Sequence, residues 1–176
     1  MATTQGIDWH ADIFSVLVGQ NISIVTHVPD AGHGPLLKMC DEAPGIKLVT
    51  LTSEQDGVGL LCGAWAGGTK GVLLMQSSGV GNTVNALSLP ASCRIPLLTI
   101  VSMRGEWGEF VPWQIPMGQG TPGVLEAMGV RIFRINEAHE VGAPVEAAAN
   151  LAFNTRQSAA VLLSQKLIGA KQFKEG

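Results

Sequence analysis

The chain has 176 residues, which suits one domain with a substantial core, and its 46% of hydrophobic residues excludes a disordered protein. The formal net charge of −3 provides no basic surface, so we expect no nucleic-acid partner. Only 14% of the residues are charged and 22 are glycines, which indicates that other subunits cover part of the surface.

The sequence also favours a soluble, cytoplasmic protein without a membrane partner. The N-terminus has no basic segment followed by an apolar run, and no stretch reaches the roughly 18 apolar residues of a membrane helix. Cys40, Cys62 and Cys93 have neither zinc-site nor CxxC spacing, so we expect free, reduced thiols. We identify no metal ligands in the chain.

Strands and helices are expected to alternate along the whole chain. Short apolar or β-branched runs predict strands at residues 22–28, 47–52, 71–77, 95–102, 130–135 and 158–164. Helical spacing predicts a helix that begins at Glu54 and others at residues 7–18, 36–40, 82–93, 121–129 and 137–155. Two segments are predicted to be irregular, a glycine-rich turn at 78–82 and a long loop at 104–121. We expect the polar tail, 168–176, to fray.

Two of these helices have a predicted buried face. In the first helix this face consists of Ile7, Ala11, Phe14, Leu17 and Val18, and in the last of Val141, Val145, Ala148, Leu151 and Ala152. The continuous apolar run at 95–102 is typical of a parallel strand that is covered on both faces. The sequence therefore predicts one domain, residues 1–176, with an α/β fold: a doubly wound, mainly parallel six-stranded sheet with helices on both faces.

The junction between the strand at 47–52 and the next helix carries a single acid, Glu54. Ser53, followed three residues later by Asp56, resembles the start of a capping box and places Glu54 at the first helical position. An acid at that position is stabilised by the helix dipole by roughly 0.3–1 kcal/mol. Its place alone therefore does not indicate a function.

The glycine-rich segment at 77–83 follows a buried strand, as phosphate-binding turns do. It departs from the dinucleotide fingerprint because Val84 stands where a third glycine or alanine is needed, and it lacks the Gly-Lys-Ser/Thr of a P-loop. Ser77 or Ser78 could be the nucleophile of a serine hydrolase, but the required Gly-x-Ser-x-Gly spacing is missing. A tight turn without a ligand accounts for this segment equally well.

Other polar residues follow predicted strands at the same end. Asp30 and His33 come after the strand at 22–28, and Arg104 follows the strand at 95–102. Because ligands of open α/β sheets bind at the carboxyl ends of the strands, these side chains and Glu54 are expected to face one crevice. An ordinary turn and a solvated arginine would also explain them, so their convergence identifies no reaction.

The order and spacing of these residues resemble a family of thiamine-diphosphate enzymes. The shared features are Glu54 after a strand, Ser77-Ser78-Gly79-Val80-Gly81-Asn82, Val28-Pro29-Asp30, Arg104-Gly105, Pro116-Met117-Gly118 and Thr121-Pro122. On these motifs the chain resembles the stand-alone pyrimidine-binding (PYR) subunits of 2-oxo acid decarboxylases. Within them it is most similar to the alpha subunits of sulfopyruvate decarboxylases and to the related phosphonopyruvate decarboxylases. The resemblance spans nearly the whole chain.

The resemblance implies a thiamine diphosphate cofactor whose pyrimidine end is bound by this chain. In the family, a glutamate at the position of Glu54 bonds N1′ of the aminopyrimidine and shares a proton with it. The resemblance also implies that Ser77, Gly79, Val80 and Gly81 lie against the pyrimidine. The implied enzyme is a carboxy-lyase that decarboxylates a 2-oxo acid, either sulfopyruvate or a close analogue such as phosphonopyruvate.

The resemblance further implies that this chain is one half of an enzyme. The family holds the diphosphate and Mg²⁺ with a second domain that carries a Gly-Asp-Gly motif, and no such motif occurs in this sequence. We therefore expect a beta subunit that completes the site in a hetero-oligomer built on dimers. One face of the helix after Glu54 is expected to pack at such an interface, and it consists of Gly59, Gly63 and Gly67.

A substrate with two anionic ends needs a cation, for which Arg104 is the candidate. Asp30 and His33 would face the same substrate, as acid–base groups or as part of the binding site. Two other hypotheses remain open from the residues alone. One is a non-catalytic ligand-binding or regulatory module with the same fold, and the other is a serine hydrolase that uses Ser77 or Ser78.

Overall fold

A computed structural model describes residues 8–169 of the chain. Its centre is one six-stranded sheet in which every neighbouring pair of strands is parallel, with the order β2-β1-β3-β4-β6-β5. The strands are β1 (Ile22–His27), β2 (Lys47–Thr50), β3 (Lys70–Gln76), β4 (Leu97–Ser102), β5 (Arg131–Ile135) and β6 (Ser158–Leu163). The predicted α/β fold with a parallel six-stranded sheet is confirmed.

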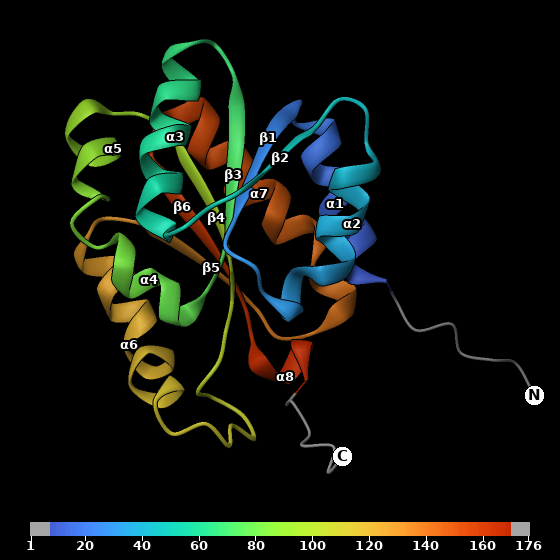
Figure 1. The fold of residues 1–176 in the computed structure, drawn as a ribbon, viewed down its shortest axis with the longest axis vertical. Helices are drawn as coiled ribbons and strands as arrows, with labels where there is room; N and C mark the ends of the chain where they lie inside the picture. The colour runs from blue at the N-terminus through green and yellow to red at the C-terminus, as the bar shows by residue number, and fades with distance from the viewer. Residues whose placement is uncertain (1–7, 170–176) are drawn as a thin grey trace, which may run out of the picture.

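Helices cover both faces of this sheet (Figure 1). One face carries α3 (Glu54–Ala66), α4 (Ser77–Thr83), α5 (Ser88–Cys93) and α6 (Gln114–Ala127), and the other carries α1 (Trp9–Gly19), α2 (Gly34–Glu42) and α7 (Gly142–Thr155). The helix α8 (Gln165–Ile168) and the 3₁₀ turns η1 (Ala31–His33) and η2 (Ala138–Glu140) are short. Within residues 8–169, no helix has the length and apolar character needed to cross a membrane.

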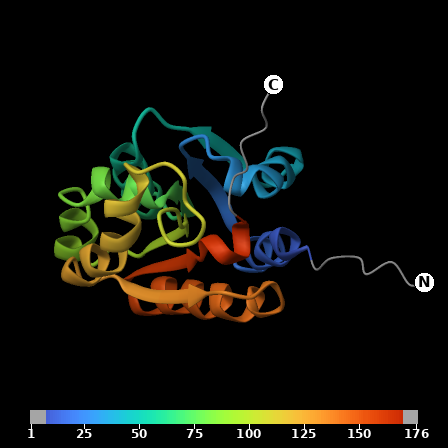
Figure 2. The ribbon, with the colours of Figure 1, turned by 90° about the horizontal axis from the view of Figure 1, so that it is seen from below.

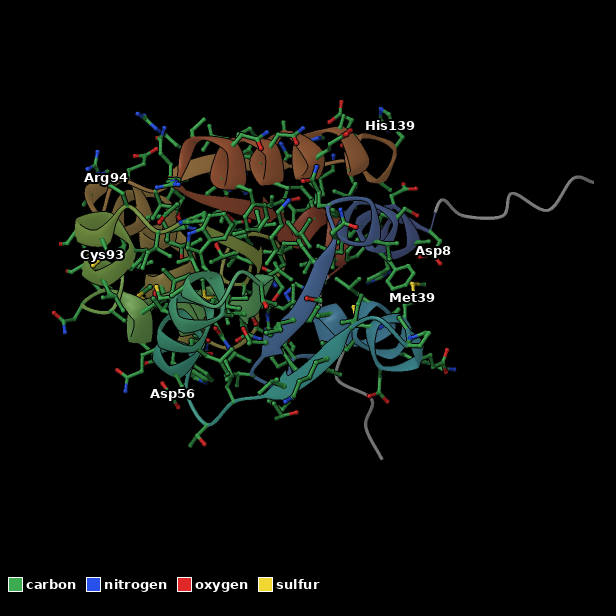
Figure 3. The ribbon with its side chains drawn as sticks, turned by 90° about the horizontal axis from the view of Figure 1, so that it is seen from above. Asp8, Met39, Asp56, Cys93, Arg94 and His139 are labelled. Atoms are coloured by element: carbon green, nitrogen blue, oxygen red, sulfur yellow. The ribbon has the colours of Figure 1, made fainter. Side chains whose placement is uncertain are left out.

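A hydrophobic core lies on each side of the sheet. The first core packs α1, α2 and α7 onto one face, and the second packs α3, α4 and α6 onto the other. Because successive side chains of a strand point to opposite faces, Leu98 and Ile100 of β4 enter the first core while Leu97 and Val101 enter the second. Figure 3 shows side chains filling the space between the layers, whereas polar side chains such as that of Asp56 project outward.

The strand order places a change of direction between β1 and β3. The chain moves from β1 outward to β2, and it then returns to β3 and continues through β4 on the other side of β1. Open α/β sheets bind ligands at the carboxyl ends of the strands at such a switch point. Figure 2 looks onto this edge, where the segment between β4 and α6 and the short helix α8 lie over the strand ends. The switch point therefore defines where to look for a site.

The first helix begins later than predicted and buries a different face. Asp8 caps α1 by accepting hydrogen bonds from two backbone N–H groups of its first turn. The buried residues of α1 are Trp9, Ile13 and Leu17. Of the predicted face, Ile7 lies outside the described residues, Leu17 is buried, Ala11 and Phe14 are partly buried, and Val18 is exposed. Apolar residues occur on several sides of this helix, so spacing alone could not select the buried side.

The last long helix is close to its prediction. The turn η2 precedes it, and α7 itself begins at Gly142 rather than at residue 137. Four of the five residues predicted to face inward are fully buried, namely Val141, Val145, Ala148 and Ala152, while Leu151 is partly buried. The predicted fraying of the tail falls mostly on residues 170–176, which lie outside the described residues.

The segment predicted as a glycine-rich turn is helical. Helix α4 begins at Ser77, directly after β3, and α5 is a separate helix that begins at Ser88. The predicted turn at 78–82 and the predicted single helix at 82–93 are therefore wrong. The small residues of α4 allow it to pack between α3 and α6, which a local turn would not require. Pro90 lies in the first turn of α5, where its missing N–H costs no helical hydrogen bond.

The long loop is shorter than predicted, and the helix after it is longer. The irregular segment ends at Trp113, and α6 then extends over Gln114–Ala127 rather than 121–129. Pro122 lies inside this helix, and Gly118 lies where a Cβ atom would overlap with the carbonyl oxygen of Arg104. Glycine and proline disfavour helices locally, but here a glycine permits the close tertiary contact that holds the helix in place.

Candidate active site

Glu54 lies at the first position of α3, as predicted, in the segment that follows β2. Ser53 is the N-cap residue, but its side chain makes no capping hydrogen bond. Glu54 is only 7% exposed, and its Oε2 atom accepts a hydrogen bond of 2.8 Å from Nδ2 of Asn82 in α4. No described residue donates a hydrogen bond to Oε1. One oxygen of this buried carboxylate is therefore available to a ligand.

The Glu54 carboxylate rests against the backbone of Gly79 in α4. A Cβ atom on Gly79 would overlap with this carboxylate, and Oε1 would be the nearest atom. Gly79 is itself buried, so the helix cannot easily turn to relieve the overlap. The lack of a side chain at this position is what leaves room for the observed conformation of Glu54.

The neighbouring residues of α4 hold the helix between α3 and α6. Val80 is fully buried in the second core. A Cβ atom on Gly81 would lie 3.5 Å from Sδ of Met117, so α6 packs here at an ordinary distance. Ser77 is buried, and its backbone oxygen accepts a hydrogen bond of 3.2 Å from Oγ1 of Thr121 in α6. These contacts fix the turn of α4 that faces Glu54.

Neither serine of α4 is arranged as a nucleophile. Ser77 Oγ accepts a hydrogen bond of 3.1 Å from the backbone N–H of Arg104. Ser78 Oγ donates a hydrogen bond of 2.9 Å to Oε1 of Gln76. No histidine within the described residues bonds to either hydroxyl group, although a serine nucleophile needs a base within hydrogen-bond reach. The geometry therefore argues against a serine hydrolase.

Asp30, which follows β1, is joined to the ends of two neighbouring strands. Ser102 at the end of β4 donates a short hydrogen bond to Oδ2, and Gln76 at the end of β3 donates one of 3.1 Å from Nε2 to Oδ1. Burial alone would raise the pKa of Asp30, but its hydrogen bonds, that from Ser102 above all, and the proximity of His33 lower the pKa overall. Asp30 is therefore a fixed negative charge at neutral pH.

His33 is buried in η1 beside this acid. Its Nε2 atom lies 3.3 Å from the backbone oxygen of Met75, which can only accept, so this nitrogen carries a proton. Burial lowers the pKa of His33, although the charge of Asp30 opposes the shift. The other ring nitrogen, Nδ1, is buried and has no hydrogen-bond partner among the described residues. His33 is therefore neutral at pH 7 and offers a free acceptor nitrogen.

Arg104, the candidate cation for the substrate, is paired within the chain. Its Nε and Nη2 atoms each donate a hydrogen bond of 2.6 Å to Glu109, and both side chains are largely buried. The hydrogen bonding from Arg104 lowers the pKa of Glu109 to about 2. Within residues 8–169 no acceptor is paired with Nη1. Nη1 is therefore the guanidinium nitrogen that stays available to an anionic ligand, together with the second N–H of Nη2.

The same ion pair organises the segment 103–113. Glu109 also accepts hydrogen bonds from two backbone N–H groups of this segment. Nε2 of Gln165 in α8 donates a further hydrogen bond of 2.9 Å to it. Gln165 in turn accepts two further backbone N–H groups through Oε1. The segment is therefore a fixed structure over the end of β4. It presents two tryptophans to the exterior, Trp107 at 61% exposed and Trp113 at 67% exposed.

Replacing Glu109 with glutamine is expected to destabilise the protein in a pH-dependent way. The pKa of Glu109 is about 2 in the folded chain against an ordinary value of 4.5, so its charge stabilises the fold above pH 4.5. That stabilisation is lost as the pH falls from 4.5 towards 2. At pH 7 the variant should lose on the order of 3 kcal/mol of unfolding free energy, and the loss should shrink below pH 4.5. Urea unfolding at pH 7, 4.5 and 3 measures both quantities.

The matched control is Glu137→Gln, which breaks the exposed ion pair between Glu137 and Lys166. Exposed pairs contribute little to stability, so this variant should unfold almost as the parent does. If both variants lost the same free energy at pH 7, the buried pair would not hold the segment 103–113.

A cavity of about 500 Å³ lies at the opposite edge of the sheet. Its lining comes from α1, the start of β1 and the segment before β2, and it includes Phe14, Val18, Ile22 and Pro44. No acid, histidine or arginine lines it. The length of β1 separates this cavity from Asp30, so it is not part of the candidate site.

Metal binding and thiol chemistry find little support in the described part of the chain. Residues 8–169 contain no group of three or more His, Cys, Asp or Glu side chains that could hold a metal ion. The three cysteines are free thiols, and Cys93 is exposed. Burial raises the pKa of Cys40 to about 11 and also raises that of Cys62. These two thiols are therefore protonated and unreactive at neutral pH.

The structure adds residues to the site that the sequence did not single out. Gln76 and Ser102 are the last residues of two mainly apolar strands, and a polar residue at a carboxyl strand end was a usable signal. Asn82 belongs to the α4 motif, but its partner Glu54 could not be recognised from spacing. Glu109 and Gln114 had no signal, because they act through contacts made only in the folded chain.

Comparisons with known proteins were made on sequence and on fold. No protein-family model matches the chain. Sulfopyruvate decarboxylase subunit alpha from Methanococcus maripaludis is 35% identical over 152 residues, which cover 86% of this chain and 91% of that relative. Sulfopyruvate decarboxylase from Methanosarcina acetivorans is 39% identical over 94 residues, which cover 53% of this chain and 24% of that relative.

Among solved structures, the fold is similar to that of 2-oxoglutarate:ferredoxin oxidoreductase from Magnetococcus marinus with 2-oxoglutarate, coenzyme A and succinyl-CoA bound. The TM-score is 0.70, and the match covers 91% of this chain and 29% of that chain. The sequence identity is 13%, so this likeness supports the fold alone.

Proposed function

The chain belongs to the family of sulfopyruvate decarboxylase alpha subunits, and on this basis we propose that it is the pyrimidine-binding half of a thiamine-diphosphate-dependent decarboxylase. The proposed reaction converts sulfopyruvate to sulfoacetaldehyde and CO₂, with phosphonopyruvate as the alternative substrate. A non-catalytic module with this fold is disfavoured, because the relatives that match most of the chain are named as decarboxylase subunits.

The observation that carries the proposal is the placement of Glu54. Its carboxylate is buried at the start of α3, lies against the bare backbone of Gly79, and has one oxygen fixed by Asn82. The other oxygen is left without a donor in the described chain. A protonated ring nitrogen could donate a hydrogen bond to this oxygen and share the proton with it. N1′ of the aminopyrimidine is such a nitrogen.

When bound, thiamine diphosphate supplies the electron sink for the carbon–carbon bond that breaks as CO₂ leaves. The role of this chain is to place a proton-exchanging carboxylate against the pyrimidine. Asn82 keeps the Glu54 carboxylate from rotating through its bond to Oε2, and the buried surroundings would strengthen a hydrogen bond between Oε1 and the pyrimidine by excluding water. Ser77, Val80 and Gly81 hold the turn of α4 that forms the wall beside it.

Asp30, His33 and Arg104 form the proposed substrate side of the site. His33 has a neutral Nδ1 that could accept a proton and return it, but this atom is buried, so a substrate would reach it only if the turn η1 moved. The fixed charge of Asp30 would repel a dianionic substrate unless a cation faces the substrate as well. We propose that Nη1 of Arg104 donates a hydrogen bond to the sulfonate. Because Glu109 already balances the charge of Arg104, this directed hydrogen bond is the main contribution of the arginine to substrate binding.

The second half of the site is proposed to lie on a beta subunit that binds the diphosphate and Mg²⁺. The matched region makes up only 24% of the sulfopyruvate decarboxylase from Methanosarcina acetivorans, so that relative carries much additional chain. The outer face of α3 is the proposed contact surface. A Cβ atom on Gly59 or Gly63 would meet no atom of this chain within 4 Å. No other segment of the described chain packs closely on these two glycines, so their surface stays open to a partner.

Replacing Gly63 with alanine is expected to stabilise the isolated chain but to weaken its binding to the beta subunit. Alanine favours the helix, so the isolated chain should gain up to about 1 kcal/mol of unfolding free energy. If a partner backbone packs on α3, the added methyl group should weaken binding of the beta subunit at least tenfold. Gly123→Ala, at an equally open position on α6, is the control that should leave binding unchanged. Equal binding by both variants would remove α3 from the interface.

The proposed function is tested by mixing this chain with its beta subunit, thiamine diphosphate and Mg²⁺ and measuring CO₂ release. We expect no release from this chain alone, and release after mixing when sulfopyruvate is supplied. Phosphonopyruvate and pyruvate define the substrate range in the same assay. An assembled complex that decarboxylates none of the three would contradict the proposal.

A further inference from the structure

Gln76, the last residue of β3, links Asp30 to three other elements of the site. Its Nε2 atom donates to Oδ1 of Asp30 at 3.1 Å. Its Oε1 atom accepts hydrogen bonds from Ser78 in α4 at 2.9 Å and from Nε2 of Gln114 in α6 at 2.7 Å. Asp30 receives its second donor from Ser102 of β4. One amide therefore connects the acid to β3, α4 and α6.

The direction of every hydrogen bond in this cluster is determined by chemistry. An ionised carboxylate can only accept, so the atom of Gln76 that faces Asp30 is the NH₂ group. Gln76 Oε1 must then receive its two partners as donors, which Gln114 Nε2 and the Ser78 hydroxyl provide. Rotating the amide by 180° would place oxygen against the carboxylate and NH₂ against NH₂. In the observed orientation Gln76 donates to Asp30 and accepts from both Gln114 and Ser78, so all three contacts are satisfied together.

The cluster is also tied to the segment over the site. Gln114 is buried and is the first residue of α6, directly after the segment 103–113. Its own Oε1 atom is buried and has no hydrogen-bond partner among the described residues. The first residue of α6 therefore contacts the amide of Gln76, and that amide in turn holds the orientation of the Asp30 carboxylate.

We propose that Gln76 is a positioning residue that holds Asp30 in one orientation and keeps it ionised, with Gln114 as the residue that orients Gln76. The relevance of this role to catalysis rests on the proposed function, in which Asp30 faces the substrate. Gln76 does not need to touch the substrate. It acts by aiming the acid and by stabilising its negative charge with a donated hydrogen bond.

The test replaces Gln76 with glutamate, which keeps the shape and exchanges the NH₂ donor for a second acceptor. In the full chain labelled with ¹³C at aspartate carboxyl groups, the signal assigned through Asp30→Asn is followed over pH. We expect its midpoint to rise by about one pH unit or more, because the new carboxylate at residue 76 would lie within hydrogen-bond distance of Asp30 and disfavour its negative charge. Gln157→Glu adds the same charge at an exposed residue before β6 and should leave the midpoint unchanged.

Other titratable groups near Asp30 enter this measurement. His33 lies in the adjoining turn, with His27 from β1 and His10 from α1 beyond it. Burial lowers their pKa values in the parent and in both glutamate variants alike, so their charge changes are common to the three titrations. The comparison between variants therefore isolates the effect of Gln76.

A second variant protects the test against misfolding. Gln114→Leu removes the donor that orients Gln76 without adding a charge, and we expect a smaller upward shift of the Asp30 midpoint. In the assembled enzyme, Gln76→Glu should move the acid limb of the kcat/KM profile upward by the same amount as the midpoint. A purely structural role would lower the melting temperature and leave the titration of Asp30 in place.

An unchanged Asp30 midpoint in folded Gln76→Glu, or in Gln114→Leu if the first variant does not fold, would overturn the proposal. This titration needs neither substrate nor beta subunit. A failure of the proposed function appears instead as a wild-type complex that releases no CO₂, so the two failures are distinguishable.

Discussion

Replacing Glu54 with glutamine is expected to lower kcat of the assembled enzyme by 10²–10⁴-fold, the usual contribution of a positioned acid–base group. Glutamine keeps the shape of the side chain and can still bond to Asn82, so the fold and the assembly should persist. It cannot exchange a proton with a ring nitrogen as a carboxylate does. Initial rates of CO₂ release at saturating cofactor and substrate measure the effect.

Asp56→Asn is the matched control for this substitution. Asp56 lies in the same first turn of α3, but it is exposed and points outward (Figure 3). Its replacement removes an identical charge from the helix start, so any effect of the helix dipole is shared by both variants. A Glu54→Gln complex as active as the Asp56→Asn complex would remove Glu54 from the chemistry.

Replacing Gly79 with alanine is the second large effect that we expect. The new methyl group would overlap with the carboxylate of Glu54, so either α4 or Glu54 must move. Because α4 is held between α3 and α6, the side chain of Glu54 should be displaced and its hydrogen bond to Asn82 should break. A misplacement of about 1 Å can cost on the order of 10²-fold in rate, so kcat should fall by at least that factor.

The control for Gly79→Ala is Gly123→Ala, at an open position on α6. Alanine fits there without any contact within 4 Å and is expected to raise stability by up to about 1 kcal/mol. Thermal unfolding of both variants checks that the chain still folds. If the Gly79→Ala complex kept the wild-type kcat, the contact between α4 and Glu54 would not control the position of the carboxylate.

The sequence was sufficient for most of the sheet because each strand is a short apolar run between polar or glycine-rich segments. The β4 prediction, 95–102, differs from the observed Leu97–Ser102 by two residues at one end. The first half of α6 was missed for the opposite reason. Pro116 and Gly118 indicate a loop locally, and only the contact of Gly118 with the backbone of Arg104 explains why the helix begins at Gln114 instead of near residue 121.

Part of the candidate site could also be anticipated from the sequence. Glu54 was found because the strand-to-helix junction is visible in the pattern, and Asp30 was found because it follows a strand. Glu109 could not be found, because it bonds to Arg104 and to Gln165, which lies 56 residues later in the chain. Likewise, the partners of Gln76 come from the segment after β1, from α4 and from α6, so its role becomes visible only when these elements are folded together.

In the proposed function, the Glu54 carboxylate exchanges a proton with the pyrimidine of a cofactor held between this chain and its partner. Exchange of the cofactor C2 proton with deuterium in the assembled complex, without substrate, reports on this step. We expect fast exchange in the wild-type complex and exchange at least 100-fold slower in Glu54→Gln, with cofactor binding retained in both. Equal exchange rates in the two complexes would contradict it.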